Sequence, residues 1–259
     1  LLNYDPIEEI VKSTQTPSTQ SNATKVMANS AQIANFLVTA GKALQGATGD
    51  SDNLSTQSTS EALVKSLVNA IEEDVKYDDG KIDLANTTLL KTVIVQGAKE
   101  ANVLAQKEAQ SQGITTSKFD TTIYFDKVDK MTDTVALVLS ASAEKVATIA
   151  QSDQAFDALS LLTKIDKVSA FTQNVAGTSL QNTIAINNKK DDAAFTLAVQ
   201  EQANALTGNA ATKAIDNQIV NTDNVVMNIE NNSTSSENIN TTTEIQNHEE
   251  SIMSKIIKA

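Results

Sequence analysis

The most telling property of this 259-residue chain is the set of residues that it lacks. It has no Cys and no Trp, a single His, and twenty basic residues that are all Lys. Without Cys the chain has no disulfide, no thiolate metal site and no thiol nucleophile, and one His excludes a histidine cluster. Without Arg it has no bidentate guanidinium clamp for phosphate or carboxylate. We therefore expect a protein that is not an enzyme.

Aromatic residues are also scarce, at 3% of the chain, while apolar residues of all kinds make up 40%. The core must therefore be built from Ala, Val, Leu and Ile, and small aliphatic side chains suit close packing of helices. At this length we expect one large domain or two small ones, which can bury a core without covalent staples.

The net charge is −12 and the sequence pI is about 4.5. An acidic surface repels nucleic acid and anionic lipid, so we expect neither as a partner. No apolar run reaches the length of a membrane span, so membrane insertion is not expected either. The absence of Cys favours an extracellular or cell-surface location. The first residue is Leu1 and no signal-peptide pattern follows, so we expect a mature or excised piece of a longer protein.

Hydrophobic periodicity predicts helices along most of the chain. A first short helix is expected to begin at Asp5 and Pro6, and residues 13–22 are expected to form a loop. The next helix covers about 20–46, and a further helix follows a capping-box pattern at Ser58 and Glu61. Its apolar positions are Leu63, Val64, Leu67, Val68, Ile71 and Val75.

Another helix is expected from Leu84 and Asn86 to a stop at Gly113. Helical periodicity then runs from Phe119 to Gly177, which is too long for one helix, so we expect a break near residues 152–153. Residues 178–192 are predicted to be a loop, and a last helix covers 192–207 and ends at Gly208. Two β-prone stretches, 92–95 and 121–125, lie within helical periods.

These patterns predict an all-α fold, a bundle of six or seven helices over residues 1–208. Beyond 209 the composition becomes rich in Asn, Thr and Ser, which is typical of an extended arm or linker. The arm, 209–259, is expected to end in a short amphipathic helix that could pack on a partner surface. Its apolar positions are Ile245, Ile252, Met253, Ile256 and Ile257.

One acidic turn is a calcium candidate, with Asp78, Asp79 and Asp83 placed around Gly80. It resembles a calcium loop only loosely, because the alternating acids and the final Glu of an EF-hand are missing. The competing interpretation is a solvated turn with Asp83 as the N-cap of the next helix, and this is the one we favour. No other cofactor is expected.

A second acidic group consists of Asp120, Asp126, Asp129 and Asp133, of which the last three share one helical face. It could hold a hard cation, or it could be a charged helix face with local ion pairs to neighbouring Lys residues. We favour the charged face. His248, beside two Glu residues in the arm, is expected to be an exposed tail residue rather than a metal ligand.

Four segments resemble an Ala-rich helical module of very large secreted or surface proteins of bacteria, which often carry cadherin-like or calcium-binding repeats. They are LLNYDPIEEIVK at 1–12, ANSAQIANFLVTAGKAL at 28–44, GKIDLANTTLLKTVI at 80–94 and FDALSLLTKIDKVSAFTQ at 156–173. The resemblance implies a helical structural module, with calcium in neighbouring segments, and marks no catalytic residue.

Three functions remain open. The leading hypothesis is a non-enzymatic structural or adhesion-type helical module of an extracellular bacterial surface protein, whose partners are other copies of itself or neighbouring domains. The second is a self-assembling subunit of an extracellular filament or surface layer. The third is a small-ligand carrier that holds its ligand between helices.

Overall fold

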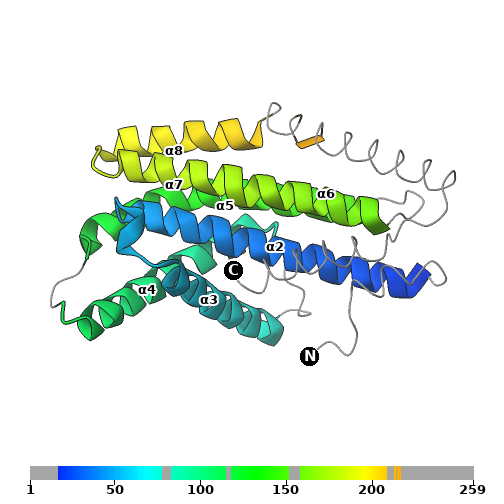
Figure 1. The fold of residues 1–259 in the computed structure, drawn as a ribbon, viewed down its shortest axis with the longest axis horizontal. Helices are drawn as coiled ribbons and strands as arrows, with labels where there is room; N and C mark the ends of the chain where they lie inside the picture. The colour runs from blue at the N-terminus through cyan, green and yellow to red at the C-terminus, as the bar shows by residue number, and fades with distance from the viewer. Residues whose placement is uncertain are drawn as a thin grey trace, which may run out of the picture.

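The computed structural model describes residues 17–77, 83–114, 118–151 and 158–208, together with Lys213, Ile215 and Asp216. Throughout these residues the regular elements are helices (Figure 1), which confirms the all-α class. The elements are α2 (Pro17–Ala47), the 3-10 helix η1 (Ser51–Asn53), α3 (Thr56–Tyr77), α4 (Thr87–Ser111), α5 (Thr121–Gln151), α6 (Ala158–Ala170), the π-helix η2 (Phe171–Ala176), α7 (Gly177–Asn187) and α8 (Asp192–Thr207).

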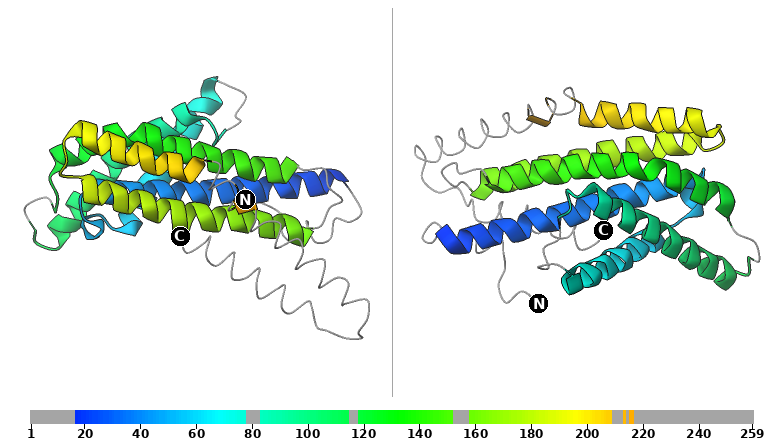
Figure 2. Two further views of the ribbon diagram at one scale, coloured as in Figure 1. Left: turned by 90° about the horizontal axis from the view of Figure 1, so that it is seen from above. Right: turned by 180° about the vertical axis from the view of Figure 1, so that it is seen from behind.

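Helix α2 lies at the centre of the assembly and contacts α3, α5, α6, η2 and α7. Helices α6, η2 and α7 follow one another without interruption and form a single long rod beside α2 (Figure 1). The α3–α4 hairpin packs on one side of α2, and α8 lies on the opposite side of the molecule against α5 and α7 (Figure 2). The fold is therefore an array of long helices in which α2 has neighbours on nearly every side.

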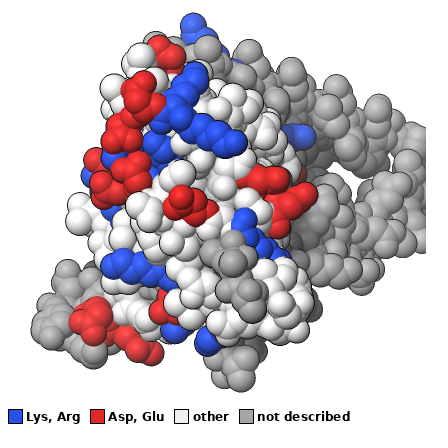
Figure 3. Space-filling view, turned by 90° about the vertical axis from the view of Figure 1, so that its left-hand side faces the viewer, with Lys and Arg blue, Asp and Glu red and all other residues white. Residues whose placement is uncertain are grey.

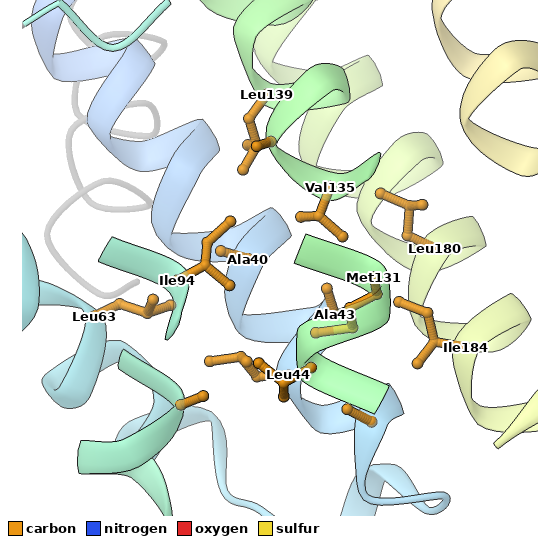
Figure 4. Close-up of a cluster of buried hydrophobic side chains, with 14 of the residues drawn as sticks. Ala40, Ala43, Leu44, Leu63, Ile94, Met131, Val135, Leu139, Leu180 and Ile184 are labelled. Carbon is orange, nitrogen blue, oxygen red and sulfur yellow. The ribbon is translucent and has the colours of Figure 1, made fainter. Parts of the chain in front are cut away.

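The main core lies where α2, α3, α4, α5, α7 and α8 converge, and Figure 4 shows part of it. Leu44 of α2, Ile94 of α4, Met131 of α5 and Ile184 of α7 are completely buried there. Small residues on α2 allow the neighbouring helices to approach closely, because an Ala side chain adds little bulk at a helix contact. The core is mainly aliphatic, as the scarcity of aromatic residues predicts, but four of the nine aromatic residues are also buried in it: Phe36, Phe119, Tyr124 and Phe195.

A second, smaller cluster joins the first half of α2 to α5 and α6. Its members are Ala28, Ala31, Val146, Ile149, Leu161, Ile165 and Val168. Because α6 packs back on α5, the chain reverses direction between them, as expected from a break after α5. The expected break point, 152–153, lies outside the described residues.

Both ends of α4 and both ends of α8 lie close to the positions expected from the sequence. The side chain of Asn86 accepts hydrogen bonds from Thr88 N and Leu89 N, which makes it the N-cap of α4. Gly113, with φ 75°, follows the end of α4 in the left-handed region that favours glycine. At α8, the Asp191 side chain accepts from Ala194 N, and Gly208 lies at the C-terminal end, as predicted.

The capping residue of α3 is Ser55 and not Ser58. Ser55 Oγ accepts a hydrogen bond from Ser58 N at 3.0 Å, whereas the Ser58 side chain is buried against the hairpin. The apolar stripe of α3 is also narrower than predicted, because Leu63 and Leu67 are buried while Val64 and Val68 are each 44% exposed. Consecutive residues of an α-helix point about 100° apart, so Val64 and Val68 cannot share the narrow contact that buries Leu63 and Leu67.

Two predicted loops are helical. Residues 17–22 belong to α2, because Pro17 occupies the first helical position, where the missing N–H costs nothing. Residues 178–187 belong to α7, because Gly177 has helical dihedral angles and continues the rod instead of ending it. Only the part from Asn188 to Asp191 connects two helices. The first predicted helix, at Asp5 and Pro6, lies outside the described residues.

Candidate functional site

A row of polar side chains on α2 faces η2 and α7, and we call it the α2 seam: Asn35, Thr39, Lys42 and Gln45. These positions follow one another at intervals of four, three and three residues, so they share one face of the helix. Thr39 is completely buried, Asn35 and Gln45 are nearly so, and Lys42 is partly buried. The contact of α2 with α7 therefore carries buried polar groups beside the aliphatic side chains of the main core, such as Leu180 and Ile184 of α7.

The first member of the α2 seam begins a chain of hydrogen bonds through three neighbouring elements. Asn35 Nδ2 donates to Ser142 Oγ of α5 at 3.3 Å, and Ser142 Oγ lies 2.8 Å from Thr172 Oγ1 of η2. Thr172 Oγ1 donates its one hydrogen to Val168 O at 2.8 Å, so Ser142 must be the donor to Thr172. Gln173 Nε2 completes the set by donating to Asn35 Oδ1 at 3.0 Å. Each of these side chains therefore makes at least one hydrogen bond within the protein.

The α2 seam also supplies donors to backbone carbonyls of the π-helix. Thr39 Oγ1 donates to Thr172 O at 3.1 Å, and the same carbonyl accepts the Gly177 N–H across the wider π-turn. Lys42 Nζ donates to Gln173 O at 2.8 Å and to Thr178 Oγ1 at 3.0 Å. Burial lowers the pKa of Lys42, because its ammonium group is partly removed from water.

Two glycines let the backbones approach along the α2 seam. A Cβ on Gly46 would lie 2.6 Å from the backbone oxygen of Gln181 in α7. A Cβ on Gly177 would lie 3.1 Å from Lys42 Cδ. At its far end the seam continues through Gln181 Nε2, which donates to Gln45 Oε1, and Asn188 Nδ2, which donates to Ala47 O. The contact is thus both close and hydrogen-bonded along its whole length.

A small pocket of about 70 Å³ lies between α5, the π-helix and the end of α8. Ser142 and Thr172, the two hydroxyls of the chain of hydrogen bonds, belong to its lining, and Val138 and Phe171 provide apolar walls. Lys145 contributes a positive charge. This volume is small for a site that binds an organic ligand.

The start of α8 is held to α5 by a group that we call the lysine cluster: Asp126, Lys127, Lys130 and Asp192. Lys127 is only 4% exposed, which is unusual for Lys. Its Nζ donates to Lys190 O and to Asp192 Oδ1, both at 3.2 Å, and lies 3.3 Å from Asp126 Oδ2. The same ammonium group lies 4.9 Å from the centre of the Phe195 ring, a cation–π distance.

The charges of the lysine cluster stabilise one another. Hydrogen bonds from Lys130 and then Lys127 hold the pKa of Asp192 below its usual value, and bonds to Asp126 and Asp192 raise the pKa of Lys130. Figure 3 views this end of the molecule and shows acidic and basic side chains next to one another. Because each described member has a partner of opposite charge, the cluster fastens helices and leaves no carboxylate pair free for proton transfer.

Two of the three acids predicted on one helical face, Asp126 and Asp133, form ion pairs, while Asp129 is exposed. Asp126 pairs with Lys130, and Asp133 pairs with Lys91 of α4 at 2.8 Å. Asp120 is instead the N-terminal cap of α5, because its carboxylate accepts from Thr122 N and Ile123 N. In the described part of the chain no group of three or more His, Asp or Glu side chains is placed to hold a metal ion.

The predicted calcium turn is only partly visible. Asp78 and Asp79 lie outside the described residues, as does His248. Asp83 is exposed, and its carboxylate accepts a hydrogen bond from Ala85 N at 2.9 Å. Asp83 therefore closes a turn one step before the helix, and Asn86, rather than Asp83, is the N-cap. Calcium at this turn stays a prediction.

Three features were not predicted from the sequence: the α2 seam, the buried Lys127 and Lys145 at the pocket. One signal was present in the sequence: polar residues at 35, 39, 42 and 45 repeat with the period of the helix, as the apolar ones do. Lys127 gave no comparable signal, because a Lys next to an Asp on a helix usually faces solvent.

Comparisons with known proteins found no matching family model, no similar curated protein and no similar solved structure. Among the described helices, none is both long and apolar enough to cross a membrane.

Proposed function

We propose that this chain is a non-enzymatic structural module, of the adhesion type, in an extracellular bacterial surface protein. The observation that carries the proposal is the α2 seam, in which buried polar groups join helices to one another. Thr39, Lys42 and Gln45 all direct their hydrogen bonds at neighbouring segments of the same chain. Polar groups used in this way set the geometry of a rigid rod and do not converge on a substrate.

The composition and the sequence resemblance support the same proposal. A chain without Cys and with a net charge of −12 suits a solvated, oxidising environment. The four segments that resemble helical modules of large surface proteins include 28–44, which contains the start of the α2 seam.

The location can be tested on intact cells that produce the protein. An antibody against the helical part should bind to unbroken cells, and external protease should remove the signal while a cytosolic marker stays intact. If the signal appears only after lysis, the surface proposal is wrong.

A second candidate is a self-assembling subunit, and exposed aliphatic side chains favour it. Val175 of the π-helix, Ile186 of α7 and Leu197 of α8 are 48%, 77% and 56% exposed. Single exposed aliphatic side chains are also common on monomers, so the candidate depends on whether replacing these residues changes assembly.

Sedimentation and negative-stain imaging would distinguish the two candidates. We expect assemblies for the unmodified chain if it is a subunit, and smaller species when Ile186 and Leu197 are both replaced by Asp. A matched control replaces Val64 and Val68 of α3, which are also exposed, by Asp. A monomer under all conditions would exclude the subunit.

A further inference from the structure

The start of α4 carries an Asn-x-Thr motif that the fold leaves accessible. Asn86, Thr87 and Thr88 form an Asn-x-Ser/Thr sequon, the acceptor pattern for sugars that are linked to asparagine. Asn86 and Thr88 are exposed, and Thr87 is half-buried. The acceptor asparagine and the hydroxyl residue of the motif are therefore both within reach of an enzyme.

The backbone at this sequon is held in place while the amide nitrogen of Asn86 stays free. Asn86 Oδ1 accepts hydrogen bonds from Thr88 N and Leu89 N, so the oxygen of the amide is used to cap α4. Ala85 O accepts from Ser140 Oγ of α5 at 2.6 Å, which fastens the turn before α4 to the bundle. Within the described part of the chain, Asn86 Nδ2 has no hydrogen-bond partner. Because an N-linked sugar is attached at this nitrogen, the acceptor atom is the one that the fold does not use.

The structure describes two more sequons, and both are less accessible. Asn22 begins a sequon inside α2, and the hydroxyl residue of that sequon, Thr24, is only 4% exposed. Asn53 belongs to the 3-10 helix η1, the next residue, Leu54, is completely buried, and Ser55 Oγ is engaged in capping α3. Because the motif is recognised over three residues, we expect neither of these sequons to serve as an acceptor in the folded protein.

We propose that Asn86 is the acceptor of an N-linked sugar in the folded protein. The donor is a sugar whose anomeric carbon is activated by a nucleoside diphosphate, and a glycosyltransferase brings donor and acceptor together. Asn86 Nδ2 forms a bond to the anomeric carbon, and the bond from that carbon to the diphosphate oxygen breaks. The nucleoside diphosphate leaves with the bonding electron pair, and Nδ2 releases one hydrogen as a proton. In the cell the modification rests on the proposed extracellular location, because N-linked sugars are surface modifications of secreted proteins.

Incubation of the purified full chain with a soluble asparagine-specific glycosyltransferase and a nucleoside-diphosphate hexose tests the acceptor. Peptide mapping by mass spectrometry measures each sequon separately, and a short Asn-x-Thr peptide shows that the enzyme is active. We expect an added hexose at Asn86 and none at Asn22 or Asn53. Because the chain is purified, the result does not depend on where the cell places the protein, so failure of the surface proposal and failure of this one are distinguishable.

Two variants remove the acceptor function without removing the helix cap. Asn86→Asp replaces the amide nitrogen by oxygen and keeps a good N-cap, and Thr88→Val removes the hydroxyl of the motif. Both should abolish the labelling at this sequon, whereas Thr88→Ser should keep it. Asn53→Asp is the matched control and should leave the labelling of Asn86 unchanged. Labelling of Asn53 in place of Asn86, labelling that survives Thr88→Val, or an unlabelled Asn86 while the peptide is labelled would each overturn the proposal.

Discussion

Two helix contacts in this molecule are built on opposite principles. The α3–α4 hairpin is aliphatic, with Leu63 and Leu67 buried against Leu90 and Ile94, and its cross-helix ion pair, Lys65–Glu100, lies at the surface. The contact of α2 with η2 and α7 contains the α2 seam. Both contacts use a glycine for close approach, Gly97 in the hairpin and Gly46 in the seam.

The difference concerns what each contact can tolerate. An aliphatic contact is non-directional, so side chains can shift to accommodate a change at a modest cost. A hydrogen-bonded contact fixes the relative position of two backbones, because donors and acceptors must meet within a few tenths of an ångström. We expect the hairpin to supply stability and the seam to supply register. Three predictions examine this division, and a fourth compares both contacts with the charged contact of α5 and α8.

The largest effect is expected from shortening a buried side chain of the hairpin. Leu67→Ala should lower the free energy of unfolding by about 2–4 kcal/mol, because it removes buried methyl groups and leaves a cavity. Val68→Ala, at the neighbouring position that is 44% exposed, should change it by less than about 0.5 kcal/mol. Urea unfolding of both variants measures the difference, and equal losses would contradict the burial pattern of α3.

The two glycines give the sharpest comparison of the contacts. Gly46→Ala should cost about 2 kcal/mol, because its Cβ meets a backbone oxygen that cannot move without shifting α7. Gly97→Ala should be nearly neutral: its Cβ would lie 2.6 Å from Leu63 Cδ2, the far end of a flexible side chain, and Ala favours helix by about 1 kcal/mol. Thermal unfolding separates the two variants; similar losses would mean that both contacts are equally rigid.

A single hydrogen bond of the α2 seam should contribute less. Thr39→Val keeps the branched shape and removes the donor to Thr172 O, which still accepts from Gly177, so we expect a loss of about 1 kcal/mol. Thr92→Val is the control, because the Thr92 hydroxyl bonds its own helix at an exposed position. That control should stay within about 0.5 kcal/mol of the unmodified protein. An effect at Thr92 as large as that at Thr39 would assign the loss to the helix and not to the seam.

The smallest effect is expected at the lysine cluster in acid. The pKa of Asp192 is lower in the folded protein, so its contribution to stability is present above its unfolded value of 3.8 and disappears as the pH falls through the lowered folded value. Asp192→Asn should therefore lose stability at neutral pH and approach the unmodified protein below that range. Asp129→Asn, on an exposed part of the same helix as Lys127 and Lys130, is the control. A pH-independent difference would show that the charge of Asp192 does not matter.

Much of the helical framework could be predicted from the sequence because its signals are local. Asn86 and Gly113 mark the ends of α4 by side-chain chemistry and by backbone freedom, and both act within a few residues. The N-cap of α3 was predicted at Ser58 but lies at Ser55. The two residues are chemically equivalent, and only burial distinguishes them. Gly177 was misread for a similar reason: a glycine that allows close approach looks the same in sequence as one that ends a helix.

The contacts of the candidate site depended on information that the sequence does not display. The hydrogen bonds of Asn35 and Thr39 join residues more than a hundred positions apart. Lys127 is buried because α8 folds over it and presents the Phe195 ring and the Lys190 carbonyl. Such pairings arise from tertiary packing, which local periodicity does not encode.

The π-helix changes the rotation of α7 relative to α6 about the axis of the long rod. Residues 168, 172, 176, 180 and 184 are all buried, at a constant interval of four, which in an ordinary α-helix would drift around the axis by about 40° per step. The wider turn at Phe171–Ala176 takes up part of that drift, so that one chain presents α6 and α7 to α2 on a common side. A deletion of one residue there would rotate everything after it by about 100°, and α7 would turn its polar groups away from α2. The π-helix thus sets the rotation of α7 relative to α6, so that the buried sides of both helices face α2.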